Sequence, residues 1–203
     1  MREDDPECES GDDRRADQRR RIVEAGAHVF AREGFAGASV ATILERSGVG
    51  RGTFYRHFRD LEDVLLAVEQ EAAERVFRAV SGKVRAQSEP DKKLYAAVTG
   101  YLVELTRSAD LLRVLHREAR GNSEAHDRIR QDAMERFVTL LREGTADAHA
   151  RGLIPRVPDD TTLFALAAAL RGVGWRYLMA HEEDRALEAA PSLLAMFAKV
   201  LAG

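Results

Sequence analysis

The chain has little cysteine, little proline and no long apolar run, and each shortage excludes a class of protein. Its single cysteine, Cys8, cannot form an intrachain disulfide or a thiolate metal site. No apolar run approaches the roughly 18 residues that suggest a membrane span, and the N-terminus lacks the apolar core of a signal peptide. We therefore expect a soluble, cytoplasmic protein with no membrane partner.

Enzyme motifs are also missing from the sequence. It contains no P-loop, no G-x-S-x-G and no H-E-x-x-H. Residues 116–118 and 181–183 bring histidine close to carboxylates, but without the i, i+4 pair that one helix face needs for metal binding. We predict no catalytic site, no metal site and no cofactor, and interpret residues 181–183 as a solvated charged loop.

Helix is favoured almost throughout, because there are only five prolines and no long alternation of β-branched residues. Glycine, proline and charged clusters divide the chain into segments with helical apolar spacing. The sequence predicts an all-α fold of about nine helices, with a small N-terminal head on a larger helical body. The expected helices lie at about 16–33, 40–47, 51–58, 61–85, 91–107, 109–119, 123–151, 159–181 and 189–202.

Charge is unevenly distributed along a chain whose net charge is −3. Residues 1–13 hold seven acidic residues and one arginine, and we predict a disordered acidic tail there. This tail either only aids solubility or competes with nucleic acid for a basic surface. Residues 14–60 hold ten arginines against five acidic residues, so basic charge is concentrated in the predicted head.

The stretch from Ser39 to Phe58 reads as two short helices joined by a tight turn. Ser39 is placed to cap the first helix, and Gly48 is placed where a left-handed residue ends it. Phe54 and Phe58 mark the buried side of the second helix. This is the pattern of a helix-turn-helix, whose second helix enters the major groove of DNA.

Residues 17–77 resemble the DNA-binding head of the TetR family of bacterial transcriptional regulators. The resemblance rests on the E-G-F loop, S-V-x-x-I, the S-G-V turn, G-T-F-Y-R-H-F and the continuation E-D-V-L. It implies a homodimer that reads a palindromic operator in double-stranded DNA, usually represses, and is released by a small molecule. The predicted domains are then the tail (1–13), the head (14–77) and a ligand-binding and dimerisation body (78–203).

The resemblance also implies which residues contact DNA. Ser39 corresponds to a phosphate contact and Tyr55 to the family's phosphate-binding tyrosine, while a guanidinium at Arg51 suits both acceptors of a guanine. Leu61 departs from a lysine common in the family, and Arg59 is the candidate substitute. The predicted DNA-binding residues are Ser39, Arg51, Gly52, Thr53, Tyr55, Arg56, His57, Arg59, Arg14, Arg15 and Arg19. The last three are included because their cluster adjoins the helix-turn-helix, and a merely solvated arginine run is the alternative for them. For Thr53 and His57 a helix cap and a packed imidazole are the alternatives.

Two features of the body suggest a dimer interface and a ligand pocket. The alanine- and glycine-rich segment 159–181 and the apolar segment 189–202 should pack on a second copy as four helices. An unknown small-molecule effector is expected among helices 91–151 and the helix from 159. The candidate pocket residues are Tyr101, Leu105, Leu112, His116, Phe137, Leu141, Trp175 and Met179, each of which is otherwise plain core.

Two other functions remain open from the sequence. One is a helical small-molecule sensor or binding protein whose operator binding is weak or lost. The other is activation of transcription instead of repression, which depends on the position of the operator. We expect the protein to be associated with the nucleoid when it is bound to DNA.

Overall fold

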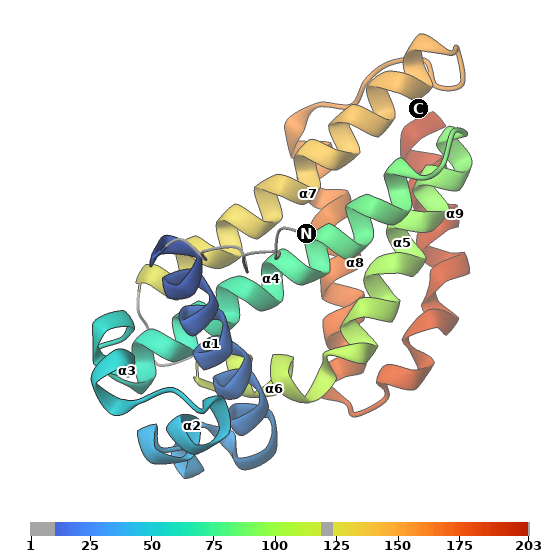
Figure 1. The fold of residues 1–203 in the computed structure, drawn as a ribbon. Helices are drawn as coiled ribbons and strands as arrows, with labels where there is room; N and C mark the ends of the chain where they lie inside the picture. The colour runs from blue at the N-terminus through green and yellow to red at the C-terminus, as the bar shows by residue number, and fades with distance from the viewer. Residues whose placement is uncertain (1–10, 119–123, 203) are drawn as a thin grey trace, which may run out of the picture. The chain divides into compact units, whose positions relative to one another are not determined.

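A computed structural model describes residues 11–118 and 124–202, and within these ranges the chain forms nine α-helices, one 3₁₀ helix and no strand (Figure 1). The predicted all-α class is confirmed. The chain divides into two compact units, Met1–Val68 and Glu69–Gly203. The predicted boundary at residue 77 falls on the same helix as this division. None of the helices in the described ranges is long and apolar enough to cross a membrane.

The first unit is the predicted head. Its helices are α1 (Gly11–Gly37), α2 (Val40–Ser47), α3 (Arg51–His57) and the start of α4 (Leu61–Arg85). Residues 1–10 of the predicted acidic tail lie outside the described residues, and residues 11–13 are helical, not disordered as predicted. The core of this unit consists of fully or almost fully buried apolar side chains, among them Ile22, Phe30, Ile43, Phe54, Phe58 and Val64.

Local sequence explains the ends of these helices. Gly34 interrupts α1 with a φ of 71°, a conformation that glycine adopts without the steric cost of a Cβ. The Ser39 hydroxyl accepts a hydrogen bond of 3.1 Å from the Thr42 N–H and caps α2. Gly48 ends α2 in the left-handed region, with a φ of 63°. The two short helices and their turn therefore form as the sequence predicts.

The second unit contains the rest of α4 together with the body helices. These are α5 (Pro90–Arg107), α6 (Ala109–Glu118), α7 (Glu124–Ala150), α8 (Asp160–Met179), the 3₁₀ helix η2 (Glu183–Ala189) and α9 (Ala190–Ala202). The α5 helix contacts α7, α8 and α9. Its Val98 and Leu102 join Leu166, Leu170 and Phe197 in one buried cluster.

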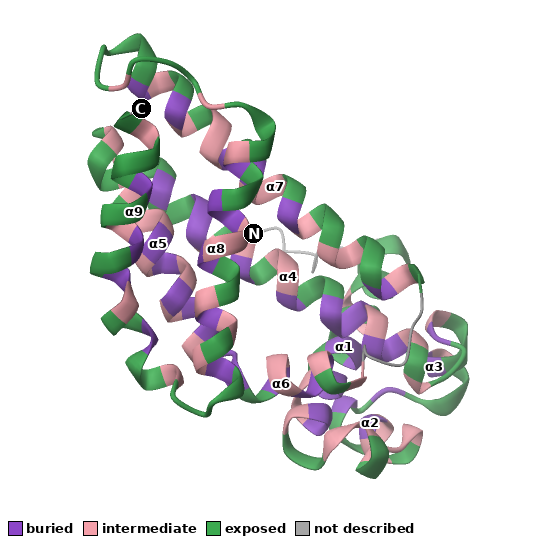
Figure 2. Cartoon of the chain, turned by 180° about the vertical axis from the view of Figure 1, so that it is seen from behind, coloured by how far each residue is buried: buried purple, intermediate pink, exposed green. Residues whose placement is uncertain are grey.

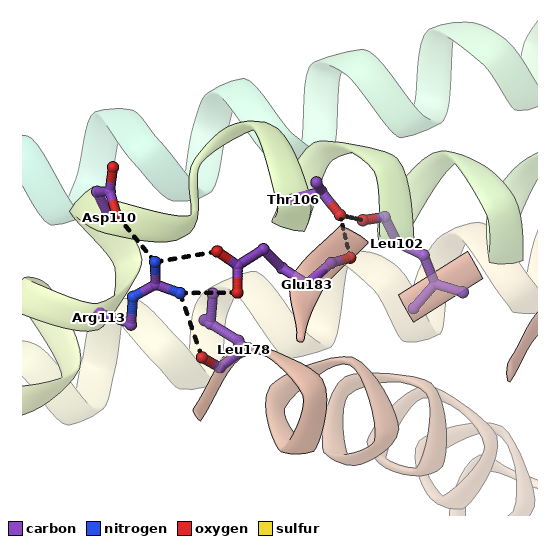
Figure 3. A network of polar contacts seen from close by, with 6 residues as sticks. All are labelled: Leu102, Thr106, Asp110, Arg113, Leu178 and Glu183. Atoms are coloured by element: carbon purple, nitrogen blue, oxygen red, sulfur yellow. Dashed lines mark hydrogen bonds and ion pairs between the residues drawn. The ribbon is translucent and has the colours of Figure 1, made fainter. Parts of the chain in front are cut away.

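A polar network connects α5, α6 and the segment after α8 (Figure 3). The Arg113 guanidinium donates to both carboxylate oxygens of Glu183, at 2.9 and 3.0 Å, and to the Leu178 carbonyl at 3.3 Å. The Thr106 hydroxyl donates to the Glu183 carbonyl at 2.9 Å. Burial alone would raise the pKa of Glu183, but hydrogen bonds from its own backbone and from Arg113 lower it overall. Glu183 is therefore a partly buried structural carboxylate, which corrects the prediction of a solvated loop at this residue, whereas His181 and Glu182 are exposed as that prediction expects.

The last two helices each have a buried side and an open side (Figure 2). Leu193 and Phe197 of α9 lie in the core of this chain, with 4% and 1% of their surfaces exposed. Met196 and Val200 on the same helix are exposed, as is Phe164 on α8, which is 52% exposed. Only part of the broad apolar face predicted for residues 189–202 is therefore available to a partner.

Candidate functional site

The α3 helix has one buried residue and an open polar face. Phe54 is fully buried, and its ring lies edge-on to Tyr55 at 5.3 Å between centroids. Arg51, Gly52, Tyr55 and Arg56 are exposed, with Tyr55 at 48%, whereas Thr53 and His57 are half-buried. Phe54 therefore fixes α3 to the core of the head, and the exposed face of α3 carries four of the residues predicted to contact DNA.

Contacts within α3 orient its exposed cations. The Arg56 guanidinium donates to the Thr53 hydroxyl at 2.7 Å, one turn earlier. The Arg51 guanidinium lies over the Tyr55 ring, 5.9 Å from its centroid. Such contacts restrict the side chains before any ligand arrives, which lowers the entropy cost of binding.

Arginines from the start of α1 lie beside α3. Arg19 lies over the Phe58 ring at 5.4 Å from its centroid. Burial lowers the pKa of His57, and the positive charges of Arg15, Arg19 and Arg56 lower it further. The lowered pKa favours the neutral form of His57, whose side chain is half-buried. Arg14, Arg15 and Arg19 are all exposed, so this end of α1 and α3 form one basic region.

Two neighbouring arginines serve the fold instead. Arg20 forms ion pairs with Asp17 and with Glu24, and Arg21 donates to the Ser47 carbonyl at the end of α2. All five arginines are exposed, but Arg20 and Arg21 are already held by partners within the head.

Arg59, the proposed substitute for a lysine at position 61, is held by Asp63. Its Nε and Nη2 donate to the two carboxylate oxygens of Asp63 at 2.7 and 2.6 Å. These bonds lower the pKa of Asp63 to about 2. The Arg59 side chain is 84% exposed, so a phosphate can reach it but must compete with Asp63. Leu61 is half-buried and offers no polar group.

Two glycines of the head have opposite surroundings. A Cβ at Gly26 would lie 2.7 Å from Val64 Cγ1, so this glycine is required for close packing between α1 and α4. A Cβ at Gly52 would meet no atom within 4 Å. Nothing in the described part of the chain explains a glycine at Gly52, although glycine costs helix stability relative to alanine.

The second unit contains a cavity of about 260 Å³ that is partly open to solvent. Seven of the eight predicted pocket residues line it: Tyr101, Leu105, Leu112, His116, Phe137, Leu141 and Trp175. Met179 does not line the cavity and is 38% exposed. The centroids of the Trp175 and His116 rings are 4.6 Å apart, and the planes of the two rings are at 74° to each other.

Sequence reasoning missed one wall of this cavity and most of its ionisable groups. The α4 helix contributes Ala72, Val76 and Val80, whereas the sequence predicts a helix at 61–85 but places none of its residues in the pocket. Glu69, Arg130 and Arg171 also line it. Isolated charged residues on amphipathic helices look like solvated positions in a sequence, so no signal marked these three.

Glu69 sits in a compact polar cluster. Its carboxylate is hydrogen-bonded to His126 Nδ1 and accepts from Arg130 Nε at 3.3 Å. Arg130 Nη1 donates to Asp127 at 3.2 Å, while Arg130 Nη2 is buried without a hydrogen-bond partner among the described residues. Within residues 11–118 and 124–202, no group of His, Cys, Asp and Glu has the arrangement of a metal site.

Comparisons with known proteins agree with this geometry. The family described as "Bacterial regulatory proteins, tetR family" matches residues 22–68, which contain most of α1, α2, α3 and the start of α4. The repressor AcnR of Corynebacterium glutamicum is 36% identical over 69 residues, covering 34% of this chain and 37% of AcnR. The chain thus matches little more than a third of that relative's length.

Solved structures extend the likeness to the whole fold. A TetR transcription regulator from Haloarcula marismortui is 20% identical with a TM-score of 0.78, over 92% of this chain and 98% of that one. The regulator FadR from Bacillus subtilis, solved with stearoyl-CoA, is 17% identical with a TM-score of 0.71, over 87% and 96% of the two chains. At these identities the likeness concerns the fold alone. Residues 22–68 of the chain therefore match the DNA-binding region of the tetR family of bacterial regulatory proteins, and the chain as described shares the fold of solved TetR-family regulators.

Proposed function

We propose that the protein is a transcriptional repressor that binds a palindromic operator as a homodimer and is released by a small molecule in the cavity of its second unit. Sequence-specific binding would come from α3, and the effector would act from the body. The observation that carries the proposal is the exposed face of α3, with Arg51, Tyr55 and Arg56 beside the arginines of α1.

The chemistry of that face suits a nucleic-acid duplex. Arg51 and Arg56 can each donate two hydrogen bonds to a guanine edge, the commonest specific contact in the major groove. Arg14, Arg15 and Arg19 supply cations for phosphates, which fix the position of a protein on DNA without reading its sequence. The open space at Gly52 allows the backbone of α3 to approach a ligand closely.

A second copy of the chain is the proposed partner of α8 and α9. Phe164, Met196 and Val200 are exposed apolar residues of these helices, and a Cβ at Gly172 would meet no atom within 4 Å. Large apolar side chains beside an open glycine favour close approach of another helix. A two-fold axis through this face would give the dimer the symmetry of a palindromic operator.

Release by an effector has a physical route through α4. This helix contributes Val64 and Val68 to the core of the first unit, and Val76 and Val80 to the cavity of the second. A ligand that changes how α4 packs in the cavity therefore acts on a helix that the head also uses. The effector lowers operator affinity only if it binds the two arrangements of α4 with different affinities.

The test is selection of duplexes from a random library by the purified full-length protein. We expect a palindromic sequence to emerge, with an affinity that falls steeply as salt rises. On that sequence, Arg51→Ala and Arg56→Ala should each weaken binding by about 5- to 150-fold, the range for losing one bidentate base contact. Arg185→Ala serves as the matched control, because this exposed arginine of the second unit pairs with Glu188.

Failure to select any sequence would contradict the regulator and favour the alternative, a small-molecule binding protein with weak or lost operator binding. Equal effects of the Arg51 and Arg185 substitutions would contradict the role of α3. Sedimentation of the protein as a monomer would contradict the proposed dimer.

A further inference from the structure

The cavity of the second unit has a composition that selects among ligands. Its volume of about 260 Å³ is under twice that of a cavity of about 150 Å³ that holds benzene, so it suits a ligand of roughly ten non-hydrogen atoms. Most of its wall is aliphatic or aromatic, with Val76, Val80, Phe137 and Trp175 on three different helices. The greater part of the ligand must therefore be apolar.

The polar groups of the wall leave positive charge unbalanced. Glu69 is already bound by His126 and Arg130. Arg171 is an exposed residue at the cavity wall and has neither an ion pair nor a hydrogen bond within the described residues. The cavity therefore offers one cation more than its carboxylate balances.

Two further donors lack an acceptor. Arg130 Nη2 is buried and makes no hydrogen bond in the described part of the chain. The Tyr101 hydroxyl also has no acceptor within residues 11–118 and 124–202. Burial raises the pKa of Tyr101 to about 12, and the nearby charge of Arg171 opposes that rise, so this hydroxyl is a neutral donor close to a cation. A buried donor without an acceptor, such as Arg130 Nη2, is costly, and a ligand oxygen would remove that cost.

The two arginines lie at one level of the cavity. Met134 and Val138 of α7 pack with Leu163 and Ala167 of α8 in one cluster. These helices follow one another along the chain and run in opposite directions (Figure 1). In antiparallel helices, Met134 then lies opposite Ala167, and Val138 lies opposite Leu163. One turn further along, Arg130 lies four residues before Met134 and Arg171 lies four residues after Ala167, so these two arginines are also opposite each other.

We propose that the cavity binds a small amphipathic monocarboxylate, whose apolar body packs against α4, α7 and Trp175 and whose carboxylate is held by Arg171, Arg130 and Tyr101. This inference rests on the proposed role of the cavity as the effector site and names the class of effector. An alkyl and an aryl carboxylate share this chemistry, and separate arms of the experiment distinguish them.

The experiment uses the emission of Trp175, the single tryptophan of the chain, as the signal from the cavity wall. The full-length protein without DNA is titrated with octanoate, with phenylpropanoate and with octan-1-ol, and calorimetry measures the same constants. At least one carboxylate should bind with saturation, and octan-1-ol should bind about tenfold or more weakly, because a charge-assisted hydrogen bond contributes about that factor.

The variants test the carboxylate site. Arg171→Gln should weaken carboxylate binding by about tenfold or more and leave octan-1-ol unchanged. Arg176→Gln on the same helix is the matched control, since Arg176 lies outside the cavity wall, over Tyr177. Tyr101→Phe, which keeps the ring against Phe137, should weaken only the carboxylate.

Three results would overturn the proposal. The first is that octan-1-ol binds as tightly as the carboxylates. The second is that Arg171→Gln and Arg176→Gln weaken carboxylate binding equally. The third is that neither carboxylate produces heat in calorimetry or a change in Trp175 emission. Because no DNA is present, these results are independent of whether the protein binds an operator. Loss of operator selection with intact carboxylate binding would refute the regulator and leave the ligand class standing.

Discussion

Gly52 offers a test in which stability and DNA binding should change in opposite directions. It is the second residue of α3, it is exposed, and a Cβ there would meet no atom within 4 Å. Alanine is favoured over glycine in a helix by about 0.5–1 kcal/mol, because its unfolded backbone has less freedom to lose. Gly52→Ala should therefore raise the free energy of unfolding of the head by up to about 1 kcal/mol.

The same substitution should weaken binding to the operator. If α3 enters the major groove with the backbone of Gly52 close to DNA, the added methyl group occupies space that the duplex needs. Overpacking by one methyl group costs about 1–3 kcal/mol where the neighbours cannot move. The dissociation constant should then rise by about 5- to 150-fold.

The assay pairs chemical denaturation with fluorescence anisotropy on a selected operator. Gly82→Ala is the control, because Gly82 is an exposed glycine of α4 with no atom within 4 Å of an added Cβ. It should stabilise the protein similarly and leave the dissociation constant unchanged. Unaltered operator affinity in Gly52→Ala would refute the close approach of this backbone to DNA. A lower free energy of unfolding would refute the conclusion that the space next to the Gly52 Cα is empty.

Three other substitutions test the fold. Gly26→Ala places a Cβ 2.7 Å from Val64 Cγ1 and should lower the free energy of unfolding by about 1–3 kcal/mol. Gly82→Ala, the control, should raise it. Asp63 has its pKa lowered to about 2 by Arg59, so its stabilisation is present above pH 4 and is lost as the pH falls to 2. Asp63→Asn should remove that pH dependence, worth on the order of 1 kcal/mol because Arg59 is exposed; an unchanged acid profile would contradict the pair. Arg113→Gln leaves a poorly exposed carboxylate without its cation and should lower the free energy of unfolding by about 2 kcal/mol or more, with no change refuting the role of this network.

Most of the structure of the head can be predicted from short-range features of its sequence. Ser39 as a cap and Gly48 as a left-handed stop act through neighbours within one turn, so the residues alone predict them. The apolar spacing of α3 predicts that Phe54 is buried, although its burial depends on the packing of α3 in the head. The exposed face of α3 follows from the same periodicity. Whether Arg51 and Arg56 read bases is a matter of the complex and stays a prediction.

The use of individual charges could not be read from residue types. Arg19, Arg20 and Arg21 are consecutive, yet Arg19 lies over Phe58, Arg20 pairs with Asp17 and Glu24, and Arg21 donates to the Ser47 carbonyl at the end of α2. Arg59, which is predicted to contact a phosphate, also binds Asp63, and this ion pair could not be read from the residue types. Consecutive residues of a helix point about 100° apart, so their partners come from different elements.

The sequence by itself determined the helices, their order and the helix-turn-helix, because caps, turns and apolar spacing depend on residues close together in the chain. Tertiary structure alone decided what the body encloses. Glu69, Arg130 and Arg171 are far apart in sequence and reach one cavity only because α4, α7 and α8 pack around it. Tertiary packing likewise buries Leu193 and Phe197 and leaves the side chains of Met196 and Val200 exposed. Which side of an amphipathic helix meets its own core depends on all its neighbours, and periodicity in one segment does not contain that information.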